Sequence, residues 1–99
     1  MYVIMFIYRA KVGEEDAIIA LHEDWQRKQG LRAKDCVWWE LLRKVEAPRE
    51  FIAIAHFASE ELAKVAENHL EQDAWYGRLL SLIEGRPVRL NCTSEWQFP

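Results

Sequence analysis

The chain has 99 residues, of which 51% are hydrophobic and 29% are charged, and its formal net charge at pH 7 is −3. This length is that of one domain, and the composition is ordinary for a globular protein. The slight negative charge and the lack of a long basic run argue against nucleic acid as a partner. No run of about 20 apolar residues occurs, so the sequence offers no candidate membrane-spanning helix. We therefore expect one domain over residues 1–99, with neither nucleic acid nor membrane as a partner.

The chain begins with an apolar and aromatic stretch over residues 2–8, "YVIMFIY". No basic residue precedes this stretch, and Arg9 and Lys11 follow it, so we interpret it as a strand rather than a signal peptide. Without a secretory signal, Cys36 and Cys92 are expected to stay reduced in the cytoplasm. Two cysteines and three histidines without HxH or i, i+4 spacing do not predict a metal site.

The first half of the chain predicts a strand over about Tyr2 to Lys11 and then a helix between Gly13 and Gly30. Acidic residues follow Gly13 and basic residues precede Gly30, as the helix dipole favours. Residues at helical spacing give this helix one apolar face; they are Ile18, Leu21, His22 and Trp25. A second strand is expected over about Cys36 to Val45 and a third over about Glu50 to Phe57.

In the second half, Ser59 is a good helix N-cap and begins a helix with an apolar stripe. A second helical piece is expected around Trp75, and we expect Gly85 and Pro87 to end it. A fourth strand is then predicted over about Val88 to Trp96.

The predicted order is β-α-β-β-α-β, which indicates a ferredoxin-like α+β fold, with two helices on one face of an antiparallel sheet. The open face of such a sheet should be polar, with alternating strands. The stretches Tyr2–Tyr8 and Phe51–Phe57 do not alternate, so both faces of the sheet are apolar. A two-fold homodimer that packs sheet against sheet would cover the open face.

Three passages carry a resemblance to a known family: "KVGEED" after the first strand, "REFIAIAHFASEEL", and "AENHLEQDAWYGRLLSLI". In these passages, and along the whole chain, the sequence resembles the antibiotic biosynthesis monooxygenase (ABM) family of dimeric α+β barrels. The resemblance implies a pocket between the sheet and the helices. It also implies a cofactor-independent monooxygenase acting on a small aromatic or quinone-like substrate.

The sequence departs from the family's known catalytic sets. The oxygenases of polycyclic phenols carry an Asn, a Trp and a Tyr where this chain has Ala53, Phe57 and about Ala63. The haem-degrading members carry an Asn near the end of the first strand, where this chain has Tyr8, and a histidine iron ligand that has no counterpart beyond Trp75. Two alternatives to the monooxygenase stay open. One is haem or porphyrin binding in the same pocket, with His69 or His22 as ligand. The other is a non-catalytic small-molecule-binding dimer.

His69 is the expected catalytic residue, because it matches the family's histidine in the second helix. Imidazole titrates near neutral pH and can act as a general base or as a donor to a phenolic substrate. A partly buried histidine bonded to a backbone carbonyl is the structural alternative. The expected substrate-binding residues are Tyr8, His22, Phe57, Trp75 and Tyr76, because aromatic walls suit flat apolar ligands. His56 is expected to face the dimer partner, since side chains alternate along a strand.

Overall fold

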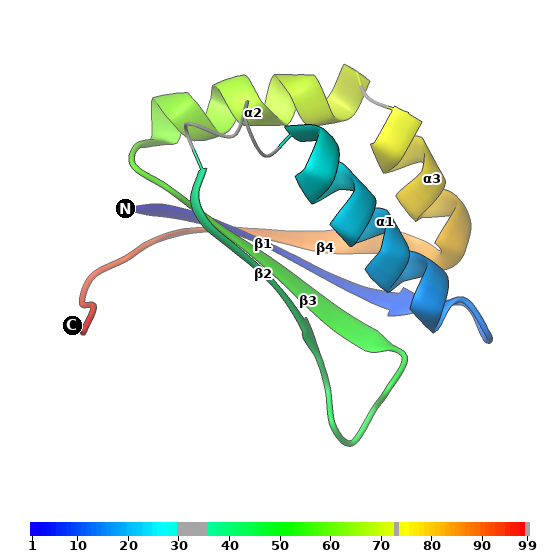
Figure 1. Cartoon of the computed structure of the whole chain (residues 1–99). Helices are drawn as coiled ribbons and strands as arrows, with labels where there is room; N and C mark the ends of the chain where they lie inside the picture. Colours follow the sequence, from blue (N-terminus) through cyan, green and yellow to red (C-terminus); the bar gives the residue numbers. More distant parts are fainter. Residues whose placement is uncertain (30–35, 73, 99) are drawn as a thin grey trace.

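The computed structural model describes residues 1–29, 36–72 and 74–98, apart from some side chains towards the C-terminal ends of two helices. Its elements follow one another as β1 (Tyr2–Ala10), α1 (Glu15–Gln29), β2 (Cys36–Arg43), β3 (Glu50–Phe57), α2 (Glu60–Gln72), α3 (Ala74–Leu82) and β4 (Ile83–Thr93). The helices lie on one face of a twisted sheet, and the opposite face carries no helix among the described elements (Figure 1).

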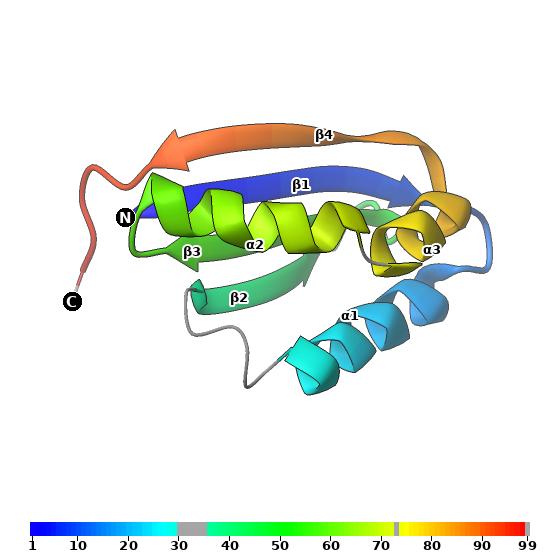
Figure 2. The same cartoon turned by 90° about the horizontal axis from the view of Figure 1, so that it is seen from above.

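The sheet has four antiparallel strands in the order β2-β3-β1-β4. This order confirms the ferredoxin-like α+β class that the sequence predicts. Viewed from above, α2 runs along the sheet over its central strands, while α1 lies beyond β2 and α3 lies between the two (Figure 2). The second helical piece expected around Trp75 is a separate helix, α3. Three helices therefore cover the sheet, whereas the predicted β-α-β-β-α-β order has two.

The expected start of the fourth strand is wrong by five residues. β4 begins at Ile83, and Gly85 lies inside it with a φ of 66°. The pairing with β1 shifts between Ile7↔Val88 and Arg9↔Glu84, so β4 bulges opposite Tyr8. Glycine adopts positive φ without a steric cost, and bulges use this freedom to bend a strand. Gly85 therefore bends β4 instead of separating α3 from it.

Other element ends differ less from the expectations, within the usual uncertainty of strand and helix ends. β1 ends at Ala10, β2 ends at Arg43 and β4 ends at Thr93, each one to three residues before the predicted end. The expected helix stop at Gly30 lies outside the described residues. Ser59 caps α2 as expected, because its Oγ accepts a hydrogen bond of 3.2 Å from the Leu62 backbone N–H.

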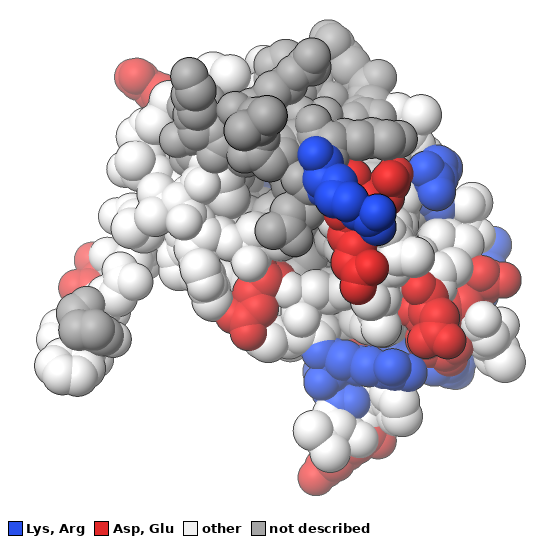
Figure 3. All heavy atoms as spheres, viewed as in Figure 1, with Lys and Arg blue, Asp and Glu red and all other residues white. Residues whose placement is uncertain are grey.

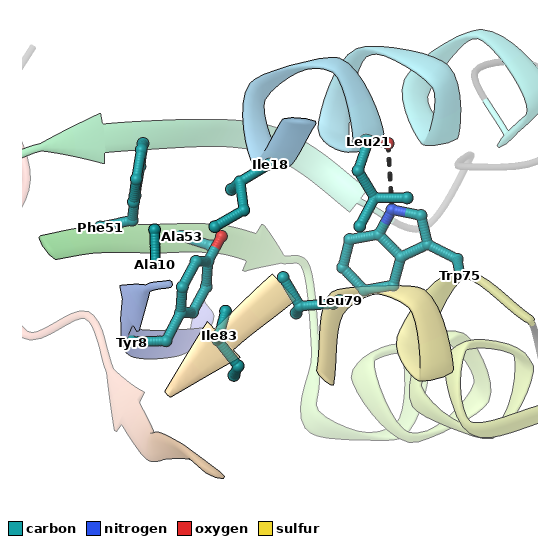
Figure 4. Packing of buried hydrophobic residues seen from close by; sticks show 9 residues of the cluster. All are labelled: Tyr8, Ala10, Ile18, Leu21, Phe51, Ala53, Trp75, Leu79 and Ile83. Atoms are coloured by element: carbon teal, nitrogen blue, oxygen red, sulfur yellow. Dashed lines mark hydrogen bonds between the residues drawn. The ribbon is translucent and has the colours of Figure 1, made fainter. Parts of the chain in front are cut away.

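The core lies between the sheet and the helices. Alternate residues of β3 are buried on this side, from Phe51 to Phe57. The larger of two core clusters joins β1, α1, β3, α3 and the start of β4, and Figure 4 shows Tyr8 and Trp75 within it. A smaller cluster around Ile4 and Ala63 lies beneath α2. The candidate site lies against the larger cluster, with which it shares Tyr8, Ala53, Trp75 and Leu79.

The open face of the sheet is apolar. The strand pairing brings Ile54 of β3 beside Met5 of β1, and Met5 beside Leu90 of β4. Large side chains on this face stay in contact with solvent, including Trp38, which is 48% exposed, and Val88, which is 56% exposed. An apolar face of this kind is unusual on a monomer.

Charged side chains of both signs mix on the face shown in Figure 3 and form no single-sign field there. At one end of the sheet, Arg9 pairs with Glu50 and Glu84, and Arg49 also pairs with Glu84. Within the described part of the chain, no helix is long and apolar enough to cross a membrane.

Candidate functional site

A cavity of about 150 Å³ lies between the helices and the sheet. Its walls come from all four strands and from two helices, α1 and α3. The lining residues are Phe6, Tyr8, His22, Trp39, Ala53, Trp75, Tyr76, Leu79, Pro87 and Arg89. The bulge in β4 places Pro87 at this wall. The cavity is therefore mostly aromatic and carries a few polar groups, as small-molecule sites usually do.

Tyr8 and His22 form the polar pair of the cavity. The Tyr8 hydroxyl and His22 Nε2 are 2.5 Å apart and share a hydrogen bond. Their rings are nearly parallel, with an angle of 3° between the planes. Both side chains are buried, and Tyr8 extends from β1 towards α1 (Figure 4). A buried polar pair of this kind is stable because each group satisfies the other.

Burial keeps this pair uncharged. Desolvation lowers the pKa of His22 from 6.5 to about 4 and raises the pKa of Tyr8 well above its ordinary value of 10. Both groups are therefore neutral at pH 7. His22 Nδ1 is also buried and has no hydrogen-bond partner among the described residues. His56 Nδ1, outside the cavity, is a second such atom, so the cavity around His22 rather than the missing partner marks the candidate site.

Two tryptophans surround the His22 ring. Trp75 meets it edge to face, with ring centroids 5.3 Å apart, and Trp39 is tilted against it at 5.7 Å. Trp75 Nε1 donates a hydrogen bond of 3.1 Å to the backbone carbonyl of Leu21, as Figure 4 shows. This bond connects α3 to α1 at the residue before His22, so Trp75 helps to hold the His22 side chain in its position over the sheet.

A smaller hollow of about 20 Å³ adjoins the cavity, and we call it the alanine slot. Its lining residues are Ile4, Phe6, Trp39, Ala53, Ala55, Phe57, Ala63 and Arg89. Four of these residues also line the cavity: Phe6, Trp39, Ala53 and Arg89. The Arg89 guanidinium carbon lies 5.7 Å from the centre of the Phe6 ring, and its Nε donates to Asn91 Oδ1.

The structure brings four of the expected substrate-binding residues to one cavity: Tyr8, His22, Trp75 and Tyr76. Phe57 lines the alanine slot instead. The side chain of His69 lies outside the described part of the chain, so its expected role stays a prediction. His56 lies on the helix-free face of the sheet, where its ring meets Trp38 edge to face at 4.7 Å.

Sequence reasoning did not assign Phe6, Trp39 or Arg89 to the site. Alternation along β1 places Phe6 on the same side as Tyr8, and this signal was available in the sequence. Trp39 and Arg89 depend on strand pairing, since Trp39 lies opposite Ala55 and Arg89 lies opposite Phe6. Among the described residues, no group of three or more His, Cys, Asp or Glu side chains could hold a metal ion.

Comparison with known structures gives the class of fold. No family model matches the chain, and no curated protein matches its sequence. Solved structures do match over nearly the whole chain, and several are described as antibiotic biosynthesis monooxygenases. The chain therefore has the fold of these proteins, and its resemblance to the family is confirmed at the level of the fold.

Three structures represent these matches. A protein of Nitrosomonas europaea, provisionally named an antibiotic biosynthesis monooxygenase, has a TM-score of 0.83 at 12% identity and covers 97% of this chain and 100% of its own. Rv0793 of Mycobacterium tuberculosis has a TM-score of 0.81 at 8% identity, covering 97% and 96%. A variant of SnoaB, a cofactor-independent oxygenase from Streptomyces nogalater, has a TM-score of 0.80 at 16% identity, covering 99% and 96%.

Proposed function

We propose that this chain is a cofactor-independent monooxygenase that acts on a small hydroxylated aromatic ring. The observation that carries the proposal is the uncharged Tyr8–His22 pair in an aromatic cavity of about 150 Å³. An engineered apolar cavity of about this volume binds benzene, so the space suits one aromatic ring. The SnoaB variant, which shares the fold, is described as a cofactor-independent oxygenase.

In the proposed reaction, His22 acts as general base towards the hydroxyl group of the bound ring. His22 is neutral at pH 7 because burial lowers its pKa, so Nε2 can accept a proton. The proton reaches it through the shared hydrogen bond: the Tyr8 hydroxyl passes its own proton to Nε2 as its oxygen takes the proton of the substrate. The phenolate that forms beside it raises the pKa of His22 again, since an opposite charge favours the protonated imidazole. Tyr8 holds His22 in place through the shared hydrogen bond.

The electron-rich phenolate then reduces dioxygen without a cofactor. One oxygen atom enters the ring and becomes the second carbonyl of a quinone. The other oxygen atom leaves as water, with the hydroxyl hydrogen and one ring hydrogen of the substrate. The ring loses two hydrogens and gains one oxygen, so dioxygen is the only oxidant needed.

His69 is the second proposed base, on the strength of the family resemblance. It lies on α2, above the sheet. Substitution of each histidine in turn separates the two candidates. We also propose that the protein is a homodimer that buries the apolar open face, because exposed Trp38 and Val88 would otherwise remain in water.

Haem does not fit the cavity as it stands. A porphyrin is several times larger than a benzene ring, and about 150 Å³ accommodates a benzene-sized ligand. The second candidate function is therefore a non-catalytic binding module. It is favoured by Ala53 and Ala63, which stand where the family's oxygenases carry polar side chains.

An oxygen electrode tests the proposal. Purified, chelator-treated protein should consume one dioxygen per ring when it is given 4-methylphenol, at a rate above the protein-free background. The same assay with His22→Gln should return to background. Binding of the ring without any oxygen consumption would support the non-catalytic module instead.

A further inference from the structure

The alanine slot extends the cavity along the sheet. Ile4, Phe6 and Tyr8 of β1 follow one another on the helix side. A strand rises about 3.4 Å per residue, so these three side chains span roughly 14 Å from one end of the site to the other. The Tyr8–His22 pair is at one end, and the slot around Ile4 is at the other.

Small side chains create the slot. Ala53 and Ala55 of β3 form part of its wall, and Ala63 of α2 is only 1% exposed. All of its lining residues are apolar except Arg89, which lies where the slot meets the cavity. One water molecule occupies roughly 10–15 Å³ by this kind of measure, so about 20 Å³ admits one or two non-hydrogen atoms.

We propose that the ligand of this site is a single-ring phenol that carries a short apolar arm opposite its hydroxyl group. The hydroxyl group contacts the Tyr8–His22 pair, the ring fills the cavity, and the arm of one or two carbons enters the alanine slot past Phe6. This inference deepens the proposed function and rests on it. In this arrangement Ala63 limits the length of the arm, and fused polycyclic substrates do not fit the site.

Isothermal titration with a homologous series tests the arm. The probes are phenol and its 4-methyl, 4-ethyl, 4-propyl and 4-hexyl derivatives. Burial of one methylene group is worth about fourfold in affinity, so the dissociation constant should fall by about that factor per carbon. The gain should stop at the ethyl group, because the slot is then full. 2-Naphthol should bind more weakly than 4-ethylphenol.

Substitution of Ala63 tests the slot itself. Ala63→Leu fills it, so phenol should bind within about twofold of the wild type while the gain from the alkyl arm disappears. Ala63→Ser adds only a hydroxyl group and should weaken the alkyl series in the same direction, which keeps the test valid if the leucine variant does not fold. Ala74→Leu, on an exposed residue of α3, is the matched control and should keep the full series.

The outcomes separate this inference from the proposed function. If phenol and all its derivatives fail to bind, the site itself is wrong and both proposals fall. If phenol binds but the arm gives no gain, or if the gain survives in Ala63→Leu, the slot is overturned while the ring site stands. Equal or tighter binding of 2-naphthol would overturn the single-ring ligand.

Discussion

Tyr8 on β1 and His22 on α1 are fourteen residues apart in the chain, and their hydroxyl oxygen and Nε2 share a hydrogen bond of 2.5 Å. This bond crosses from the sheet to the helix layer inside the cavity. Each partner is neutral at pH 7, because burial moves both pKa values away from neutrality in opposite directions. The first three predictions concern this pair and the contacts that hold it.

His22→Gln should remove most of the activity. The loss of a general base typically lowers the rate by about 10²–10⁴-fold, and glutamine keeps a polar side chain in the same space. His56→Gln is the matched control, since His56 lies on the open face of the sheet against Trp38. Steady-state oxygen uptake measures both. If His69→Ala stops turnover while His22→Gln does not, the base is His69.

The free energy of unfolding should depend on pH in the way that the lowered pKa of His22 predicts. Its pKa is about 4 in the folded protein and 6.5 when unfolded, so the unfolded chain binds the extra proton first as the pH falls. The contribution is fully present above pH 6.5 and is lost between pH 6.5 and 4. At pH 5 the loss is about 2 kcal/mol of the free energy of unfolding.

Urea denaturation at pH 7.5 and pH 5 measures this loss. His22→Gln removes the titrating group, so the variant should lose about 2 kcal/mol less than the wild type between these pH values. Carboxylates titrate alike in both proteins and cancel in the comparison. Equal losses in the two proteins would mean that His22 titrates at an ordinary pKa and is not desolvated.

Trp75→Phe should loosen the site as well as the fold. The variant loses the hydrogen bond from Nε1 to the Leu21 carbonyl, which then keeps only its bond within α1. The expected cost is about 0.5–1.5 kcal/mol, measured by urea denaturation, together with a lower kcat as His22 loses its support. Trp96→Phe, at a position 81% exposed, should change neither quantity. A Trp75→Phe protein with unchanged stability would argue against this tie between α1 and α3.

Ile54→Asp should dissociate the proposed homodimer. Ile54 lies on the open face beside Met5, so a carboxylate there would be buried without a partner in a sheet-on-sheet dimer. Sedimentation at micromolar concentration should give twice the chain mass for the wild type. Val45→Asp, at a turn position 95% exposed, should behave like the wild type. A wild-type protein that sediments as a soluble monomer would contradict the dimer.

The fold could be predicted largely from local pattern. The apolar and aromatic runs of β1 and β3 and the acidic first turns of α1 and α2 depend only on neighbours in the sequence, and all four elements are present in the structure. The start of β4 was not predictable in this way. Gly85 and Pro87 are typical of a helix end, and only the pairing of β4 with β1 shows that they form a bulge.

The site was less accessible to sequence reasoning. His22 and His69 both lie on apolar stripes of helices, and spacing alone does not tell which one meets a partner. The hydrogen bond to Tyr8 and the contact with Trp75 depend on how α1, α3 and β1 pack in three dimensions. The same holds for Arg89, which reaches the cavity from the edge strand.

Isotope labelling tests the central claim most directly. The protein is incubated with 4-methylphenol under isotopically heavy dioxygen, and the product is analysed by mass spectrometry. A monooxygenase places one heavy oxygen atom in the quinone and one in water, and the incorporation depends on His22. A quinone without heavy oxygen, formed together with hydrogen peroxide or at the same rate in His22→Gln, would contradict the account.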